Sequence, residues 1–133
     1  MKLKFLKAEE PGRKAKATVH STGKLGFSKE AVEYLGIKEG KSIQFAQDEE
    51  NPDDPNLYAV IHLGATEGAF RINKAGNYFY LNTTNLFDGL KLDYKGKKII
   101  YDLVKFQYEG KQFIKMVRRD IKRKNRIGEK NKL

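Results

Sequence analysis

The chain has 133 residues, of which 39% are hydrophobic, and it contains neither Cys nor Trp. This length allows one domain, or two very small halves that share a core. The lack of Cys excludes disulfides and thiolate metal sites and fits a reducing, cytoplasmic compartment. No apolar run is long enough to cross a membrane, and the basic N-terminus lacks the apolar stretch of a signal peptide.

The charge predicts the class of partner. A net charge of +10 and a pI near 9.7 favour a polyanion, most often nucleic acid. More than half of the Lys and Arg residues lie within residues 2–16 and 115–132, near the two ends. Residues 45–56, FAQDEENPDDPN, are instead acidic, and we expect an exposed loop there. This loop lacks the residue spacing of an EF-hand calcium site.

The first half of the chain predicts the element order β-β-α-β-β. Residues 16–20 alternate apolar and polar side chains, as a strand with one buried face does, and Gly23 interrupts the pattern as at a turn. Ser28 suits a helix N-cap and Gly36 a left-handed C-terminal residue. The remaining strands of this half are predicted at residues 24–27, 42–45 and 57–63.

The second half predicts the same order. We expect its strands at residues 69–73, 77–81, 98–108 and 113–117. A short helix within NTTNLFDG would begin at Asn82 or Thr83 and end at Gly89. Tyr78, Phe79 and Tyr80 lie in one of these strands, and Phe106, Tyr108 and Phe113 lie in or beside the last two.

The two halves align with each other. A shift of 53 residues places Ala17 on Phe70 and Gly23 on Gly76, and an insertion in the DYKGK turn changes the shift to 56. Neither half can bury its strands alone, whereas a closed barrel leaves no exposed strand edge. We therefore predict a mainly β (α+β) fold: one closed barrel with pseudo-twofold symmetry and short helices. Its domain spans residues 1–118, with repeats at about 14–64 and 67–118, and residues 119–133 form a flexible basic tail.

The stretch VHSTGKLGFSKEAVEYLGIKEGKSIQF resembles the AbrB/SpoVT family of swapped-hairpin DNA-binding domains. The shared pattern is a strand, glycine with a basic residue, an apolar run, a short helix ending in LGI, a glycine turn and a strand. The resemblance covers roughly residues 15–118, in a tandem arrangement like that of MraZ-type or double-psi barrel proteins. It implies a DNA-binding transcriptional regulator. Because the second copy already supplies the partner hairpin, we expect a monomer rather than a dimer.

The predicted nucleic-acid contacts come from both copies and from the tail. The resemblance implies contact by Lys24, with His20 and the strand lysines nearby, whereas Asn77 stands at the basic position of the second copy. The tail also permits a short helix with a basic face, formed by Arg118, Lys122 and Arg126. The full set of candidate residues is Lys14, Lys16, Lys24, Arg71, Lys74, Arg118, Arg119, Lys122, Arg123, Lys124 and Arg126.

Other functions have weaker signals. His20 and His62 match no metal-ligand or catalytic spacing, and no nucleophile or phosphate-loop motif occurs, so we predict no enzyme activity, cofactor or metal. A binder of single-stranded DNA or RNA is the first alternative, with Phe79 and Tyr108 expected to face outward and stack on bases. A protein-interaction module with a basic tail is the second. DNA is the preferred partner over RNA.

Overall fold

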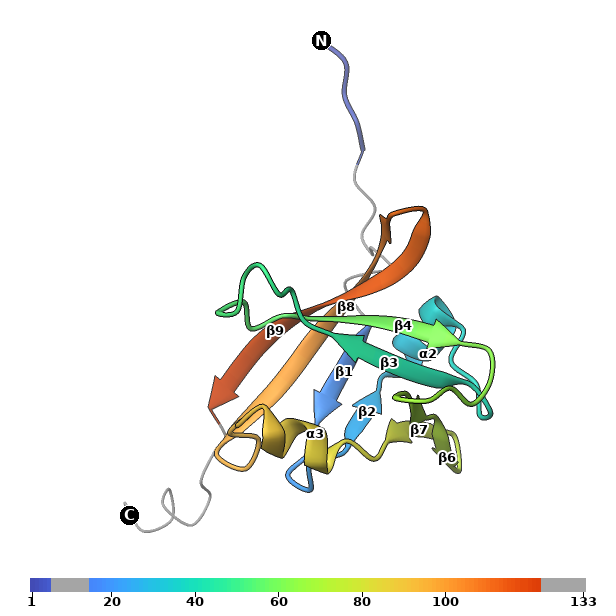
Figure 1. The fold of residues 1–133 in the computed structure, drawn as a ribbon. Helices are drawn as coiled ribbons and strands as arrows, with labels where there is room; N and C mark the ends of the chain where they lie inside the picture. The colour runs from blue at the N-terminus through green and yellow to red at the C-terminus, as the bar shows by residue number, and fades with distance from the viewer. Residues whose placement is uncertain (6–14, 123–133) are drawn as a thin grey trace, which may run out of the picture.

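The computed structural model describes residues 1–5 and 15–122 (Figure 1). This part of the chain is mainly β, as predicted, with nine strands and two short helices. The elements are β1 (Lys16–Val19), β2 (Leu25–Phe27), α2 (Lys29–Leu35), β3 (Ser42–Ala46), β4 (Leu57–His62), β5 (Phe70–Arg71), β6 (Asn73–Ala75), β7 (Tyr78–Leu81), α3 (Thr84–Gly89), β8 (Lys97–Tyr108) and β9 (Lys111–Lys122).

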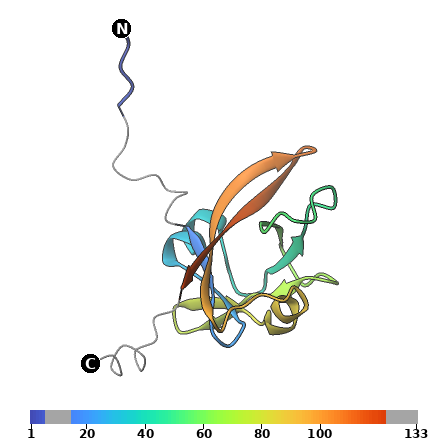
Figure 2. The same cartoon turned by 90° about the vertical axis from the view of Figure 1, so that its left-hand side faces the viewer.

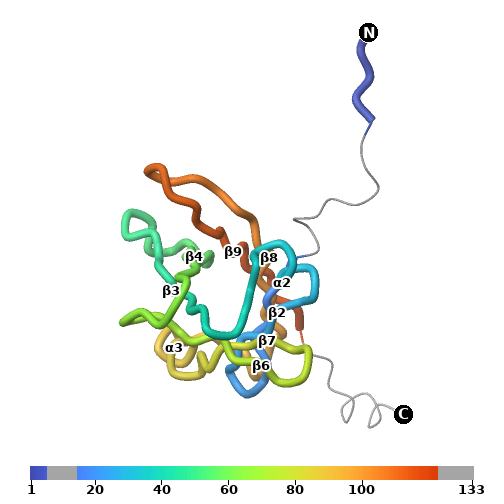
Figure 3. Tube along the Cα trace, turned by 90° about the vertical axis from the view of Figure 1, so that its right-hand side faces the viewer, coloured from blue at the N-terminus to red at the C-terminus, as the bar shows by residue number. Residues whose placement is uncertain are grey.

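The strands form one antiparallel sheet that closes almost completely into a barrel. Its order is β5-β3-β4-β9-β8-β1-β2-β7-β6. The two edge strands, β5 and β6, are consecutive in the chain and are separated by Ile72 alone. The two ends of the sheet therefore meet in one short segment, and the strands surround a single interior (Figure 3). Such closure leaves few backbone groups free to pair with another chain.

Side chains from both halves of the chain fill this interior and form the hydrophobic core. Val19, Leu25 and Ile72 are completely buried, and Tyr101 is almost so. The helices each add one buried side chain, Ala31 from α2 and Phe87 from α3. Phe87 stacks on Tyr101 with the ring centroids 6.4 Å apart. Burying a ring such as that of Phe87 typically contributes about 1.5–3 kcal/mol, and this burial anchors α3 to the barrel.

Both helices begin and end where the sequence predicts, although the N-cap side chain of the second makes a different hydrogen bond. Ser28 Oγ accepts a hydrogen bond from the Ala31 amide at 3.1 Å, and Gly36 is left-handed, with φ of 66°. Thr83 is the N-cap of α3, but its hydroxyl donates to the Gly23 carbonyl oxygen at 2.9 Å instead of capping the helix. Gly89 belongs to α3, and the left-handed residue after it is Lys91, with φ of 57°.

The hairpin of β8 and β9 is longer than predicted. Its strands have 12 residues each and pair from Lys97–Lys122 to Tyr108–Lys111. Glu109 and Gly110 form the turn, both with positive φ, as a type I′ turn requires. Because β9 continues to Lys122, residues 119–122 belong to the sheet and not to a tail. Arg118 and Lys122 accordingly do not form the predicted basic helix, while residues 123–133, Arg126 among them, lie outside the described residues.

Candidate nucleic-acid interface

Five neighbouring strands present one row of side chains away from the core. Thr18 in β1 lies opposite both Ile100 and Gly26, Gly26 lies opposite Tyr80, and Ile100 lies opposite Arg119. In β1, β2, β7 and β8, residues that alternate with this row are buried in the barrel; they include Val19, Leu25, Leu81 and Tyr101. Because side chains alternate between the two sides of a sheet, this row faces outward. We call the surface of β9, β8, β1, β2 and β7 around it the outer face.

A cluster of rings lies on the outer face. The rings of Tyr78 and Tyr80 stack with centroids 6.3 Å apart and an interplanar angle of 16°. His20 Nε2 forms a hydrogen bond with the Tyr78 hydroxyl, and Lys24 Nζ lies 5.1 Å from the centre of the Tyr80 ring. Burial raises the pKa of Tyr78. We call His20, Lys24, Tyr78 and Tyr80 the ring platform.

Gly26 makes room for this platform. A Cβ atom at this position would lie 2.6 Å from His20 Nε2 and would collide with the Tyr78 ring. A side chain here would force both rings away from the strand. Because Gly26 has no side chain, the rings of His20 and Tyr78 can lie directly over β2.

The predicted basic residues of the two copies lie on different sides of the sheet. Lys16 and Lys24 are on the outer face, where Lys16 lies opposite Asp102. Lys74 lies opposite Phe79, with its Nζ 5.5 Å from that ring, and thus on the opposite side of β7 from Tyr78 and Tyr80. Arg71 is exposed in β5, at the edge of the sheet. The structure does not bring Arg71 and Lys74 to the outer face.

The arginines of β9 already bind carboxylates. Arg118 contacts both oxygens of Asp120, at 2.7 and 2.8 Å, and Arg119 contacts both oxygens of Asp102, at 2.6 and 3.0 Å. The hydrogen bond with Arg118 lowers the pKa of Asp120 and raises that of Arg118. Each pair cancels one positive charge that we had assigned to phosphate binding. Lys122 is exposed at the end of β9, and Lys14, Arg123, Lys124 and Arg126 lie outside the described residues.

The prediction of outward-facing aromatic residues is half correct. Tyr108 is 57% exposed, as expected. Phe79 instead packs against the core, so its predicted exposure is wrong. The turn at Gly76 explains the error, because it sets the register of β6 and β7 so that Ala75 pairs with Tyr78. In this register Tyr78 and Tyr80 point outward and Phe79 points the other way. Sequence reasoning also missed Lys98, which is exposed on the outer face opposite Ile121.

Comparisons with protein-family models, with curated proteins and with solved structures found no match. The resemblance to AbrB-like domains therefore stays a prediction. Within residues 1–5 and 15–122, no helix is long and apolar enough to cross a membrane. The same residues contain no group of three or more His, Cys, Asp or Glu side chains that could hold a metal ion.

Proposed function

We propose that the protein binds nucleic acid through the outer face, as a DNA-binding regulator of the kind that the AbrB resemblance implies. The observation that carries this proposal is a set of three lysines on the outer face: Lys24 at the ring platform, Lys16 in β1 and Lys98 in β8. Lysines at such a surface attract phosphates, and these contacts position a protein on DNA without reading its sequence.

Binding of single strands is the second candidate, and the same rings favour it. Tyr78 is 39% exposed, and Tyr80 stacks beside it. Tyrosine rings on a sheet surface stack on unpaired bases, typically contributing about 1–3 kcal/mol per base. In a duplex the faces of the bases are covered by their neighbours, so duplex binding would depend on the lysines and much less on the rings.

We also propose that the barrel arose from two equivalent halves, and strand pairing supports this. When the halves are exchanged, β1 corresponds to β5, β3 to β8 and β4 to β9, and each pairing between these strands has a counterpart. The β1–β8 pair Ala17–Tyr101 corresponds to the β5–β3 pair Phe70–Ile43. The β3–β4 pair Ile43–Ile61 corresponds to the β8–β9 pair Tyr101–Arg118, and Leu57–Met116 corresponds to Ala59–Ile114 between β4 and β9. The β2–β7 pair at Leu25–Leu81 is its own counterpart. These equivalences differ by up to three residues from the shifts of 53 and 56 read from the sequence.

This symmetry bears on how DNA would be bound. The proposed twofold axis passes between β2 and β7, under the ring platform, and it relates Lys24 to Tyr80. The platform is thus one asymmetric site built from both halves. A monomer with one such site has no second copy with which to read the other half of a palindrome. Recognition of palindromic DNA would need a second molecule.

Binding to fluorescent random-sequence duplex and single strand at several salt concentrations tests the proposal. The log–log slope should be about −0.9 per phosphate neutralised on duplex and about −0.7 on single strand. Lys24→Ala should reduce the slope by the equivalent of about one phosphate, whereas Lys38→Ala, in the exposed segment between α2 and β3, should not. Tyr78→Leu should weaken single-strand binding alone. Failure to bind either nucleic acid at low salt would refute the function.

A further inference from the structure

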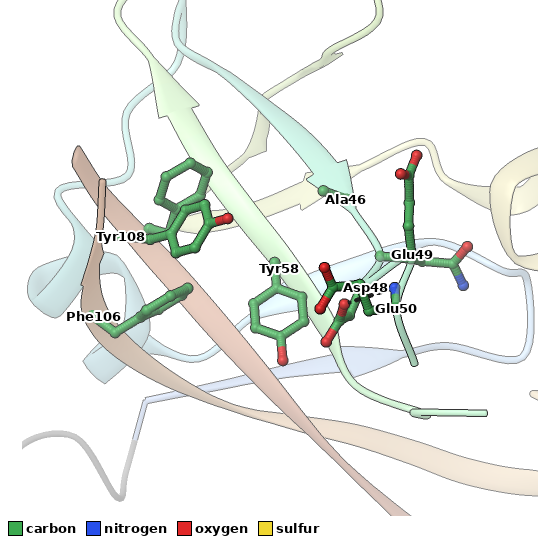
Figure 4. A pocket seen from close by; sticks show the side chains of 9 residues that line it. Ala46, Asp48, Glu49, Glu50, Tyr58, Phe106 and Tyr108 are labelled. Atoms are coloured by element: carbon green, nitrogen blue, oxygen red, sulfur yellow. Dashed lines mark hydrogen bonds between the residues drawn. The ribbon is translucent and has the colours of Figure 1, made fainter. Parts of the chain in front are cut away.

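The free end of the β8–β9 hairpin and the loop after β3 extend from the same side of the barrel (Figure 2). Side chains from both line one concave site. Its volume is about 520 Å³. Rings form one wall and carboxylates the other, and Tyr58 stands between them (Figure 4). We call it the aromatic–acidic cleft; its lining residues are Ala46, Gln47, Asp48, Glu49, Glu50, Tyr58, Phe106, Tyr108 and Phe113.

The aromatic wall is continuous. Tyr58 meets Phe106 edge to face at 5.7 Å, Phe106 lies 5.8 Å from Phe113, and Phe113 lies 5.9 Å from Tyr108, as measured between ring centroids. The neighbours of Tyr58 in β4, Leu57 and Ala59, point into the barrel and are buried. The four rings therefore lie outside the core and complete no part of it. Aromatic side chains that line a concave site are typical of ligand pockets.

The acidic wall is held in place from within. Asp48 Oδ1 accepts a hydrogen bond from the Glu50 amide at 3.0 Å, and the Tyr58 hydroxyl donates to Asp54 Oδ2 at 3.4 Å. Burial, together with the negative charges of Asp54 and Asp48, raises the pKa of Tyr58. Within residues 1–5 and 15–122, no Lys or Arg lines the cleft, although Lys115 in β9 lies opposite Tyr58. Because no three acidic side chains of the described residues converge on a metal position, this charge suits a larger cation.

We propose that the aromatic–acidic cleft binds an arginine side chain from a basic segment of a protein partner. The guanidinium group is planar and weakly hydrated, so it stacks on aromatic faces while it pairs with carboxylates. Lysine carries a compact, strongly hydrated charge that gains less from rings. The volume of the cleft falls in the range of small-ligand pockets, about 300–1,000 Å³, which admits an arginine and part of its backbone. Nucleic acid is disfavoured because its phosphates would face three carboxylates.

A labelled peptide with two arginines between glycines tests this, with fluorescence anisotropy of the full chain as the readout. The matched peptide carries citrulline, which has the same shape as arginine but no charge. We expect the arginine peptide to bind and the citrulline peptide to bind at least about tenfold more weakly. A lysine peptide should fall between them. Equal binding of the arginine and citrulline peptides would overturn the proposal.

Two sets of variants locate the binding. Two changes should each weaken binding of the arginine peptide by about tenfold or more. One is the triple change Asp48→Asn, Glu49→Gln, Glu50→Gln, and the other is the single change Tyr108→Ala. The control is Glu30→Gln, Glu33→Gln, Glu39→Gln, which removes the same charge from α2 and its following turn. Circular dichroism should report the same fold for all of them. If the control triple weakens the peptide equally, the peptide senses only overall charge and the cleft is not its site.

Nucleic acid provides an independent readout. The Asp48, Glu49 and Glu50 variant should bind random-sequence single strand at least as tightly as the unaltered chain does. This result is expected because removing carboxylates cannot weaken attraction to phosphates. Weaker nucleic-acid binding by this variant would mean that the cleft belongs to the nucleic-acid interface, and the separate arginine site would be wrong.

Discussion

At the residue scale, Gly26 is the position on which the ring platform depends. Its φ is not positive, so an alanine is compatible with the backbone, but its methyl group would displace Tyr78 and His20. Both side chains reach this position with their outer ends and can swing into solvent. Gly26→Ala should therefore change the free energy of unfolding by less than about 1 kcal/mol while weakening single-strand binding.

Thermal unfolding and single-strand binding measure the two effects of Gly26→Ala. Gly64→Ala is the control, since no atom of the described part of the chain lies within 4 Å of a Cβ atom there. A Gly26→Ala chain that binds as well as the Gly64→Ala chain would show that the platform takes no part in binding. A large loss of stability would instead mean that the two rings support the barrel.

Tyr101 gives the fold a dependence on alkaline pH. Burial raises the pKa of its phenol to about 12, above the ordinary value of about 10. The unfolded chain therefore loses this proton first. The stability due to the neutral phenol is complete below about pH 10 and is lost as the pH rises towards 12. As the pH rises over this interval, the free energy of unfolding of the Tyr101→Phe chain should fall by about 2 kcal/mol less than that of the unaltered chain.

Urea denaturation of both chains between pH 9 and pH 12 measures the contribution of Tyr101. The Phe variant keeps the ring that stacks on Phe87. Titration of the surface lysines is common to both chains and cancels in the difference. Equal losses in the two chains would mean that Tyr101 ionises as readily in the barrel as in the unfolded state.

At the scale of the elements, the β8–β9 hairpin contains a carboxylate that should oppose the proposed nucleic-acid binding. Asp102 forms an ion pair with Arg119 on the outer face, and Asp102 lies opposite Lys16 in the neighbouring strand β1. Asp102→Asn removes one negative charge and releases the guanidinium group for a phosphate. Nucleic-acid affinity should rise, and the log–log salt slope should steepen by up to about 0.9 on duplex.

The control for Asp102→Asn is Glu67→Gln, which makes the same change of charge in the exposed turn before β5. Salt titrations of both variants against random-sequence duplex compare the slopes. If both variants change the slope equally, only the net charge matters. Weaker binding by Asp102→Asn would imply that Arg119 must be held by Asp102 to contact DNA.

The elements themselves show what the sequence could predict. Local signals were sufficient for α2, where Ser28 and Gly36 mark its two ends. The end of β9 was missed because Arg118, Arg119 and Asp120 have the composition of a solvated tail. Their strand is stabilised by pairing with β8 and by carboxylates placed across or along the hairpin. The ring platform was missed because its members, such as His20 and Tyr78, are far apart in the chain and meet only through the β2–β7 pairing.

At the scale of the whole molecule, neither half of the chain should fold alone. β1 pairs with β8, β2 with β7, β3 with β5 and β4 with β9, so every sheet neighbour outside a hairpin comes from the other half. Fragments 1–66 and 67–133, separated in the exposed turn before β5, should each be largely unfolded. When mixed, they should regain the barrel.

Circular dichroism and amide NMR spectra of the fragments, alone and mixed, measure this complementation. A spectrum of the mixture that matches the intact chain is the expected result. A fragment that folds by itself as a monomer would contradict a shared core. A folded homodimer of the first fragment would strongly support the proposed equivalence of the halves, because β2 would then take the place of β7.

The position of β9 in the sheet has a consequence for synthesis on the ribosome. This strand lies between β4 and β8 and joins the two sides of the barrel, although it is made after all the other described strands. Because synthesis proceeds at about 5–20 residues per second, the apolar faces of the earlier strands stay uncovered for seconds until β9 has been made. During that time, the nascent chain offers those faces to chaperones or to neighbouring chains. Mutations that slow folding of this barrel should therefore reduce its yield in cells more than its stability after purification would suggest.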